Sequence, residues 1–213
     1  LSFGCVLPCS RIRVSGRNNA KLCWHYKNRI LPMNELLLIP AERHPDKRGY
    51  FSESYNKQKF LEYGVSHDFV QDNYSLSVKE KTLRGLHFQA PPHAQAKLIK
   101  CIRGKIFDVA IDIRLGSPSF GKWKSYLLSA ENGSQLYIPI GFAHGFLTLD
   151  KNTEIAYKCS DFYCPQSEGA LHWNDPDLGI NWPLDDDPLV SEKDNDASFL
   201  REFSSPFILG ENS

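Results

Sequence analysis

The sequence predicts a mainly β protein, an antiparallel sandwich or jelly roll with a few short helices. Many short apolar runs follow one another along the chain, and several of them alternate apolar and polar residues as half-buried strands do. The segments between them hold glycine, proline and asparagine, as in residues 103–105, 116–118 and 131–133. No long helical pattern alternates with the runs, which argues against a doubly wound fold.

The expected elements follow from local patterns in chain order. A short helix is expected over residues 56–63, where Phe60 and Leu61 stand among polar residues and Gly64 follows as a C-cap. Residues 185–213 begin with three aspartates and carry scattered apolar residues, so a short helix or a cover over the core is expected there. The segments with strand character are residues 36–39, 50–55, 69–71, 97–102, 106–113, 123–128, 135–138, 146–149 and 154–158.

Composition excludes several classes of protein. Lys+Arg and Asp+Glu both number 25, for a formal net charge of +0, so a chain-wide basic field for nucleic acid is absent. No apolar run reaches the roughly 18 residues that span a bilayer. The six cysteines form no CxxC pair, and a chain of 213 residues needs no disulfides to hold its core. These observations favour a cytoplasmic protein with free thiols, without membrane or nucleic-acid partners.

The first residues differ from the rest. Residue 1 is Leu and the only methionine is Met33, while residues 1–32 show no clear period of two or 3.6. Their short apolar stretch does not fit a signal peptide. We therefore expect residues 1–32 to be a non-native or disordered extension, and residues 33–213 to be a single jelly-roll domain.

One glycine–proline–histidine motif indicates a cupin-like roll. Gly133, Pro139, Gly141 and His144 have the spacing of the second cupin motif, in which tight turns aim the histidine into the mouth of the roll. In the first motif, Gln89 stands where a second histidine ligand is expected after His87. A stable divalent site needs at least three good ligands, so we expect neither a metal nor any other cofactor.

Several further segments carry a resemblance to a known family. They are 48–53, 71–73, 82–89, 94–98, 108–114, 138–146 and 173–176, which stand in order and at matching spacing. Together they resemble the dTDP-4-dehydrorhamnose 3,5-epimerase family over about residues 36–195. The resemblance implies inversion of C3 and C5 of dTDP-4-dehydro-6-deoxy-D-glucose, which gives dTDP-4-dehydro-L-rhamnose for dTDP-rhamnose biosynthesis. It also implies a homodimer, in which a strand such as 36–39 adds to the partner's sheet.

The chemistry explains the residue types that the resemblance places in the site. Protons alpha to a C4 ketone are weak acids, and His87 resembles the family's base. Lys97 resembles the residue that stabilises the enolate, and Tyr157 the acid that reprotonates the opposite face. Asp194 resembles the carboxylate that orients His87, with Asp175 as the alternative.

The remaining assignments concern the substrate. Arg84 and His144 match positions that line the sugar and its ketone, and Tyr163 matches an aromatic residue that stacks on the ligand. The positions that match residues binding the nucleotide and pyrophosphate are Arg48, Glu53, Gln71, Asn73, Glu168 and Lys193.

Other functions compete with this hypothesis. A relative that inverts one carbon would need the same base and acid, whereas a ketoisomerase would not need Tyr157 on the opposite face. A sugar-nucleotide-binding cupin without catalysis would not need base, enolate stabiliser and acid together. Each residue also has a structural interpretation, because a lone strand histidine, lysine or tyrosine is more often part of a core or a solvated face.

Overall fold

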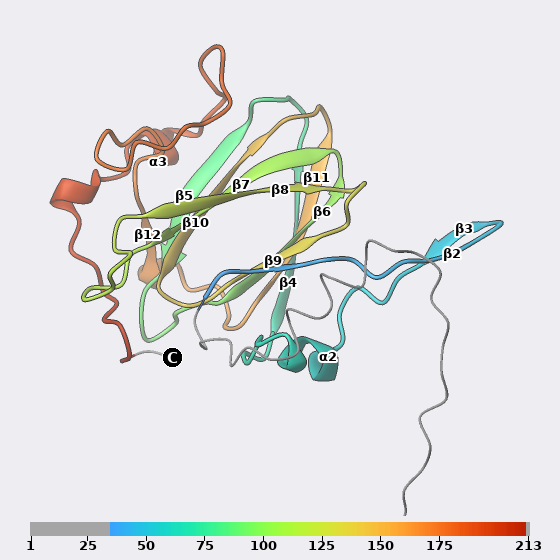
Figure 1. The fold of residues 1–213 in the computed structure, drawn as a ribbon. Coiled ribbons are helices and arrows are strands. Elements are labelled where there is room, and N and C mark those ends of the chain that lie inside the picture. Colours follow the sequence, from blue (N-terminus) through green and yellow to red (C-terminus); the bar gives the residue numbers. More distant parts are fainter. Residues whose placement is uncertain (1–34, 212–213) are drawn as a thin grey trace, which may run out of the picture. The chain divides into compact units, whose positions relative to one another are not determined.

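The protein forms two five-stranded antiparallel sheets in the computed structural model, which describes residues 35–211 (Figure 1). The predicted extension over residues 1–32 lies outside the described residues. In spatial order, the first sheet comprises β1 (Leu37–Ile39), β9 (Gln135–Ile138), β6 (Lys97–Arg103), β11 (Thr153–Cys159) and β4 (Gln71–Ser77). The second comprises β12 (Glu168–Ala170), β5 (Leu83–Gln89), β10 (Phe142–Thr148), β7 (Lys105–Asp112) and β8 (Trp123–Ser129).

The other elements are short. They are the hairpin of β2 (His44–Asp46) and β3 (Gly49–Phe51), the helices α2 (Lys57–Glu62) and α3 (Glu192–Asn195), and two 3-10 turns at Pro165–Ser167 and Leu200–Glu202. The predicted fold class, mainly β with a few short helices, is confirmed. Within residues 35–211, every helix is too short or too polar to cross a bilayer.

The two sheets pack face to face around one apolar cluster. Ile99, Leu136 and Ile155 come from the first sheet, and Ile106 and Leu128 from the second, and all five are at most 2% exposed. Strand alternation turns every second side chain of each sheet toward this interior. The interior therefore fixes the register of the strands that also carry the site.

The outer face of each sheet has a cover of its own. Phe60 of α2 packs with Leu98 and Tyr137 on the first sheet. On the second sheet, Leu178 and Phe207 from the C-terminal segment pack against inner strands of that sheet. The expectation that residues after 185 act as a cover is consistent with this arrangement.

The predicted helix agrees with the structure because its caps are local. Asn56 is the N-cap, and its side chain accepts hydrogen bonds from the backbone N–H groups of Gln58 and Lys59. Gly64 follows the C-cap with φ +96°, a conformation that glycine adopts without strain.

Several expectations for strands need correction. The strand expected at 69–71 is β4, which begins at Gln71 and runs to Ser77, and the strand expected at 50–55 is only β3. The strand expected at 146–149 is β10, which begins at Phe142. Strands β2, β5 and β12 had no predicted counterpart. The extent of β4 was not predicted because Gln71, Asn73 and Ser75 line pockets instead of the apolar core. The strand therefore lacks the alternation of apolar and polar residues on which the prediction relied.

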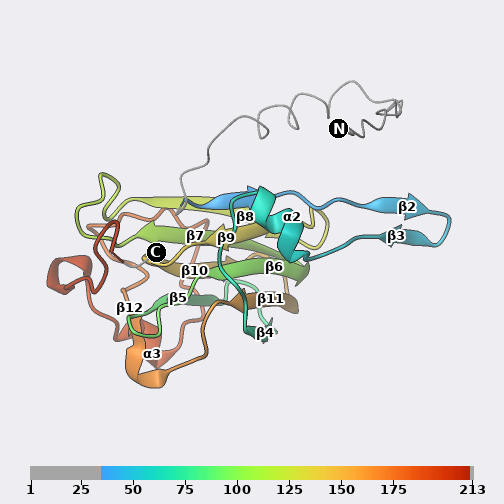
Figure 2. The ribbon, with the colours of Figure 1, turned by 90° about the horizontal axis from the view of Figure 1, so that it is seen from below.

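The sequence led us to expect that a strand over residues 36–39 adds to the sheet of a partner chain. Strand β1 pairs with β9 of the same chain, with Leu37 opposite Tyr137. The β2–β3 hairpin projects beyond the ends of the two sheets, on the side away from α3 (Figures 1 and 2).

A close backbone approach beside the site gives a stability prediction. Gly85 has φ +115°, and a Cβ there would lie 2.6 Å from Gly145 Cα and from the His144 carbonyl oxygen. Gly116 has φ +79° but open space around it. We expect Gly85→Ala to lower the free energy of unfolding by about 2–4 kcal/mol, the sum of a positive-φ cost and overpacking. Gly116→Ala should cost only about 1–2 kcal/mol, as measured by urea unfolding. An equal decrease in the free energy of unfolding in the two variants would contradict the close backbone approach at Gly85.

Candidate active site

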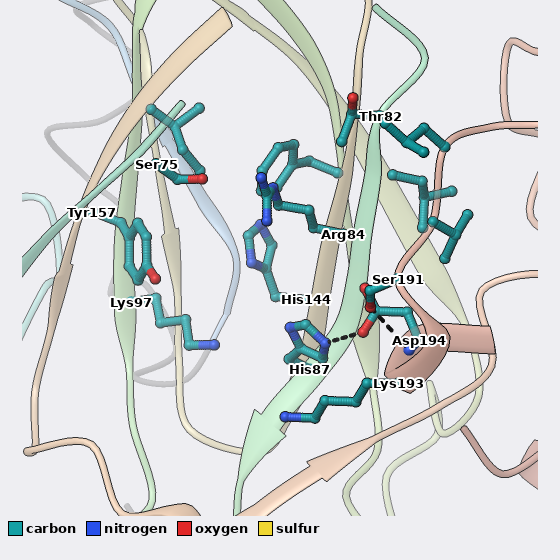
Figure 3. Close-up of a pocket in the computed structure, with 15 residues that line it drawn as sticks. Ser75, Thr82, Arg84, His87, Lys97, His144, Tyr157, Ser191, Lys193 and Asp194 are labelled. Atoms are coloured by element: carbon teal, nitrogen blue, oxygen red, sulfur yellow. Dashed lines mark hydrogen bonds and ion pairs between the residues drawn. The ribbon is translucent and has the colours of Figure 1, made fainter. Parts of the chain in front are cut away.

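A pocket of about 490 Å³ opens between the two sheets beyond their shared core. Strands β5 and β10 of the second sheet form one wall, and β6 and β11 of the first sheet form the other (Figure 3). Residues 189–194, which lead into α3, close one side. Seven of the sequence-predicted residues line it: Arg84, His87, Lys97, His144, Tyr157, Lys193 and Asp194.

His87 and Asp194 form the most direct contact in the pocket. The Nε2 atom of His87 lies 2.7 Å from Oδ1 of Asp194, whose Oδ2 accepts from the backbone N–H of Gly85 at 3.1 Å. Burial by itself would raise the pKa of Asp194, but the hydrogen bond and charge of His87 outweigh it and hold that pKa below its ordinary value. An ionised carboxylate accepts a hydrogen bond from Nε2–H of the neutral ring, so Nδ1 is the nitrogen that can take up a proton.

Asp175, the alternative partner of His87, has other contacts. Its carboxylate accepts from the backbone N–H groups of Asp177, at 2.7 Å, and Leu200, at 2.5 Å. It is 2% exposed and holds the turn that leads to the C-terminal 3-10 helix. The structure therefore brings Asp194, and not Asp175, to His87.

Tyr157 and Lys97 lie on the wall opposite His87. Figure 3 shows His87 on one side of the pocket and Tyr157 on the other, with Lys97 extending between them. Burial raises the pKa of the Tyr157 phenol, so the phenol stays protonated and can act as a proton donor. Burial lowers the pKa of Lys97, and the charges of Cys159, Glu168 and Asp108 oppose that effect.

His144 is held by a carboxylate that sequence analysis did not assign. Both carboxylate oxygens of Asp108 lie 3.0–3.1 Å from His144 Nε2, and the Asp108 side chain is fully buried. Burial raises the pKa of Asp108, while His144 and Lys97 oppose the shift. The signal was present in the sequence, because an acidic residue stands inside the otherwise apolar run 106–111.

A second pocket of about 270 Å³ continues from the first. His87, Lys97 and Tyr157 line both pockets, so the two are neighbouring parts of one cleft. The residues of the second pocket are mostly polar and include four more predicted positions: Gln71, Asn73, Tyr163 and Glu168.

Hydrogen bonds join these polar residues into a network. Gln71 donates to Asn73 at 3.1 Å and accepts from the Tyr163 backbone N–H at 2.9 Å. The Tyr163 hydroxyl donates to Glu168 at 2.8 Å, and Lys193 forms an ion pair with Glu168 at 2.6 Å. Burial would raise the pKa of Glu168, but Lys193 and Tyr163 outweigh it and lower that pKa.

Arg48 and Glu53 are the two predicted residues that line neither pocket. Arg48 lies on the exposed β2–β3 hairpin, where it pairs with Asp46 at 2.5 Å. Glu53 pairs with Lys59 of α2 at 2.8 Å. In a single chain they are away from the cleft.

The Nε2 atoms of His87 and His144 are already engaged by carboxylates. Gln89 donates to the carbonyl oxygens of His93 and Phe162. In the part of the chain that the structure describes, no group of three or more His, Cys, Asp or Glu residues is placed to hold a metal ion.

Comparisons with known proteins point to one family. Residues 31–202 match the sequence profile described as dTDP-4-dehydrorhamnose 3,5-epimerase. A protein of that name from Salmonella typhimurium is 50% identical over 167 residues, which are 78% of this chain and 91% of the relative. A crystal structure of the dTDP-6-deoxy-D-glucose-3,5-epimerase from Legionella pneumophila, in complex with dTDP-4-keto-L-rhamnose, is 44% identical with a TM-score of 0.76, covering 81% of this chain and 93% of that one.

A more distant similarity bears on the number of carbons inverted. A 3'-monoepimerase from Streptomyces bikiniensis, in complex with dTDP-quinovose, is 35% identical with a TM-score of 0.74, covering 80% of this chain and 86% of that one. The identity to the 3,5-epimerases named above is higher than this.

The lowered pKa of Asp194 gives a pH-dependent prediction. A carboxyl group with a depressed folded pKa stabilises the protein above its unfolded pKa of about 3.9, and the stabilisation is lost as pH falls through the folded pKa. We expect Asp194→Asn to lower the free energy of unfolding by about 1–3 kcal/mol at pH 7. Urea unfolding should show the difference from the wild type shrinking below about pH 4. The exposed Asp187, changed to Asn, is the control. A loss of stability in Asp194→Asn that does not vary with pH would contradict a stabilising role for the ionised Asp194 carboxylate.

Proposed function

The chain belongs to the dTDP-4-dehydrorhamnose 3,5-epimerase family, and we propose that the cleft described above carries that activity. The reaction inverts C3 and C5 of dTDP-4-dehydro-6-deoxy-D-glucose, and its product serves dTDP-rhamnose biosynthesis. The observation that supports this best is a His–Asp pair on one wall of the pocket facing a tyrosine on the other. Such a site can remove a proton from one face of a carbon and return one to the opposite face.

His87 is the base in this proposal. Its bond to Asp194 holds a proton on Nε2 and leaves the Nδ1 lone pair free to take a proton from C3 or C5. Asp194 also stabilises the imidazolium that forms, since it stays ionised in the folded protein. The backbone N–H of Gly85 fixes the second carboxylate oxygen.

Lys97 stabilises the enolate. Removal of the alpha proton places negative charge on the C4 oxygen, and a positive charge in a water-poor pocket stabilises such an oxyanion strongly. Burial lowers the pKa of Lys97, while the charges of Cys159, Glu168 and Asp108 favour its charged form. His144, held by Asp108, and Arg84 then contact the ketone side of the sugar.

Tyr157 is the acid on the opposite face. Its pKa is raised by burial, so it holds its proton until the enolate carbon takes it. The nucleotide and diphosphate bind in the second pocket, where Gln71 and Asn73 supply amides and Tyr163 offers a stacking surface. Lys193 lines the neighbouring first pocket and adds positive charge beside Glu168. Glu168 holds Lys193 and Tyr163 at the mouth.

Solvent isotope exchange tests the activity. In D2O the wild-type protein should exchange the protons at both C3 and C5 of dTDP-4-dehydro-6-deoxyglucose, with no loss after EDTA treatment. His87→Ala should lose exchange at both carbons by at least about 10²–10⁴-fold, because it removes the base. The measurement is NMR of the recovered sugar. Exchange at one carbon only would favour the single-carbon epimerase, and binding without exchange would favour a non-catalytic cupin.

Tyr157→Phe separates exchange from inversion. The ring and its packing remain, while the donor hydroxyl is lost, so stability should change little. His87 can still remove and return a proton on its own face. We expect deuterium exchange to continue while net epimerisation falls by about 10²-fold or more. Equal losses of both, in a folded variant, would assign the hydroxyl to substrate positioning instead.

A homodimer is also part of the proposal, and exposed apolar groups support it. Tyr74 and Leu76 on the outer face of β4 are 77% and 51% exposed, and Tyr50 and Phe51 on the hairpin are 57% and 69% exposed. A second copy would cover them. It would also give Arg48 and Glu53 a role at the partner's cleft, since both lie away from the cleft of their own chain. The cytoplasmic location expected from the sequence is retained, with Cys101, Cys159 and Cys164 as free thiols.

Light scattering tests the dimer. We expect a mass of twice the 24.3 kDa chain at micromolar concentration. Tyr74→Lys should shift the mass toward the monomer, because a charge would be buried in the contact. Leu127→Lys, on an exposed residue of β8 in the other sheet, should leave the mass unchanged. A wild-type monomer would overturn the proposal.

A further inference from the structure

The short helix α3 supplies Asp194, and the position of this helix decides whether that carboxylate reaches His87. The carboxylate points from α3 toward His87, whose Nε2 lies 2.7 Å from Oδ1 (Figure 3). A helix of four residues does not hold its position by its own hydrogen bonds. Ser191 caps its N-terminal end. Its C-terminal end, at Asn195, must be held by another part of the chain.

Residues 168–171 lie directly beside the strand that carries His87. Strand β12 pairs with β5 so that Ala170 stands opposite His87. Leu171 and Leu86 then exchange both backbone hydrogen bonds, at 2.9 and 3.2 Å, and both residues are fully buried. This stretch is therefore fixed relative to the proposed base.

The residues that follow this stretch bind the chain beyond α3. The backbone N–H of His172 donates to the Ser198 carbonyl oxygen at 2.9 Å. The carboxylate of Asp175 accepts from the backbone N–H of Leu200 at 2.5 Å. Residues 168–175 therefore connect β5 with the chain on the far side of α3.

One side chain of this connection reaches α3 itself. The indole N–H of Trp173 donates to Oδ1 of Asn195 at 3.0 Å, and Asn195 is the last residue of the helix. The ion pair of Lys193 with Glu168 also joins α3 to β12. A lysine side chain is flexible and can follow the helix if it moves, whereas a rigid indole donates its hydrogen bond in one direction only. The indole contact is therefore the one that defines the position of the helix end.

This step rests on the proposed function, in which Asp194 orients His87 as the base. We propose that Trp173 is a positioning residue for the reaction, whose indole N–H keeps α3 where the Asp194 carboxylate meets His87 Nε2. Trp173 lines neither pocket of the cleft, so it acts through Asn195 and does not touch the substrate. The partner of one ring nitrogen fixes which nitrogen carries the proton. A displaced α3 would leave some molecules with the proton on Nδ1, where the ring cannot take a proton from the substrate.

Trp173→Phe tests this role, because it keeps an aromatic ring and removes the N–H. We expect kcat for epimerisation to fall roughly tenfold with KM unchanged, since a misplaced base slows the chemical step without weakening binding. Trp123→Phe is the matched control. The Trp123 indole donates the same kind of bond at 3.0 Å, to the Leu178 carbonyl oxygen, which joins β8 to the cover of the second sheet. This variant should keep the wild-type kcat.

The tautomer of His87 separates positioning from a general loss of stability. Nitrogen-15 NMR of the histidine rings shows which nitrogen carries the proton, and it is measured at about pH 8, where imidazole groups are ordinarily neutral. In the wild type His87 should carry the proton on Nε2, and in Trp173→Phe its signals should show a mixture of both forms. His144, which Asp108 holds, is the internal reference and should not change. Trp123→Phe should leave both rings as in the wild type.

Asn195→Ala removes the acceptor of the same bond. It should match Trp173→Phe, and the double variant should be no slower than either single variant, because one contact is lost in all three. Asn195 is exposed, so Asn195→Ala also carries the test if Trp173→Phe does not fold. A folded Trp173→Phe or Asn195→Ala with wild-type kcat and a single His87 tautomer would overturn the positioning role, as would an equal fall of kcat in Trp123→Phe. Absent proton exchange in the wild type would instead overturn the proposed function, while the tautomer measurement would still test Trp173.

Discussion

The hydrogen bond between His87 and Asp194 joins two parts of the chain that are 107 residues apart. His87 lies on β5, an inner strand of the second sheet, whereas Asp194 lies on a helix of four residues that follows a long irregular segment. A helix this short gains little from its own hydrogen bonds, so tertiary contacts must hold it in place. Ser191 caps the helix by accepting from the Asp194 N–H, and a parallel bridge between Thr82 and Leu189 ties the segment to the start of β5. The lining of the pocket on that side depends on this attachment.

Burial of charge is the second constraint. Asp108 is fully buried behind His144, and a buried charge that has no partner is unfavourable by several kcal/mol. Asp108 resolves this by contacting His144 directly, and the charges of His144 and Lys97 oppose the effect of burial on its pKa. The same low dielectric strengthens any interaction with a developing enolate, so the feature that makes the site unfavourable for stability favours its chemistry.

The sandwich separates stability from function along its strands. On β11, Ile155 packs in the core cluster and Tyr157 packs at its edge, while Cys159 faces the polar pocket. The inner face of one strand thus changes from core to cleft within five residues. Rigid strands on both walls hold the base and the acid apart, which suits a reaction that needs opposite faces of one carbon.

Local chemistry in the sequence determined the strands with apolar alternation, the Asn56 cap and Gly64 end of α2, and the turns that aim His144 into the roll. The family motifs identified His87, Lys97 and Tyr157, which the structure brings to one pocket. Strand β4 was largely missed, because the residues that face the cleft are polar and imitate a loop. Only the tertiary structure decided between Asp194 and Asp175, since long-range packing fixes which carboxylate reaches a ring nitrogen. The tertiary structure also showed that Asp108 contacts His144 and that Arg48 and Glu53 lie away from the cleft of their own chain. The first depends on strand register and the second on the direction of the hairpin, and no local sequence pattern specifies either.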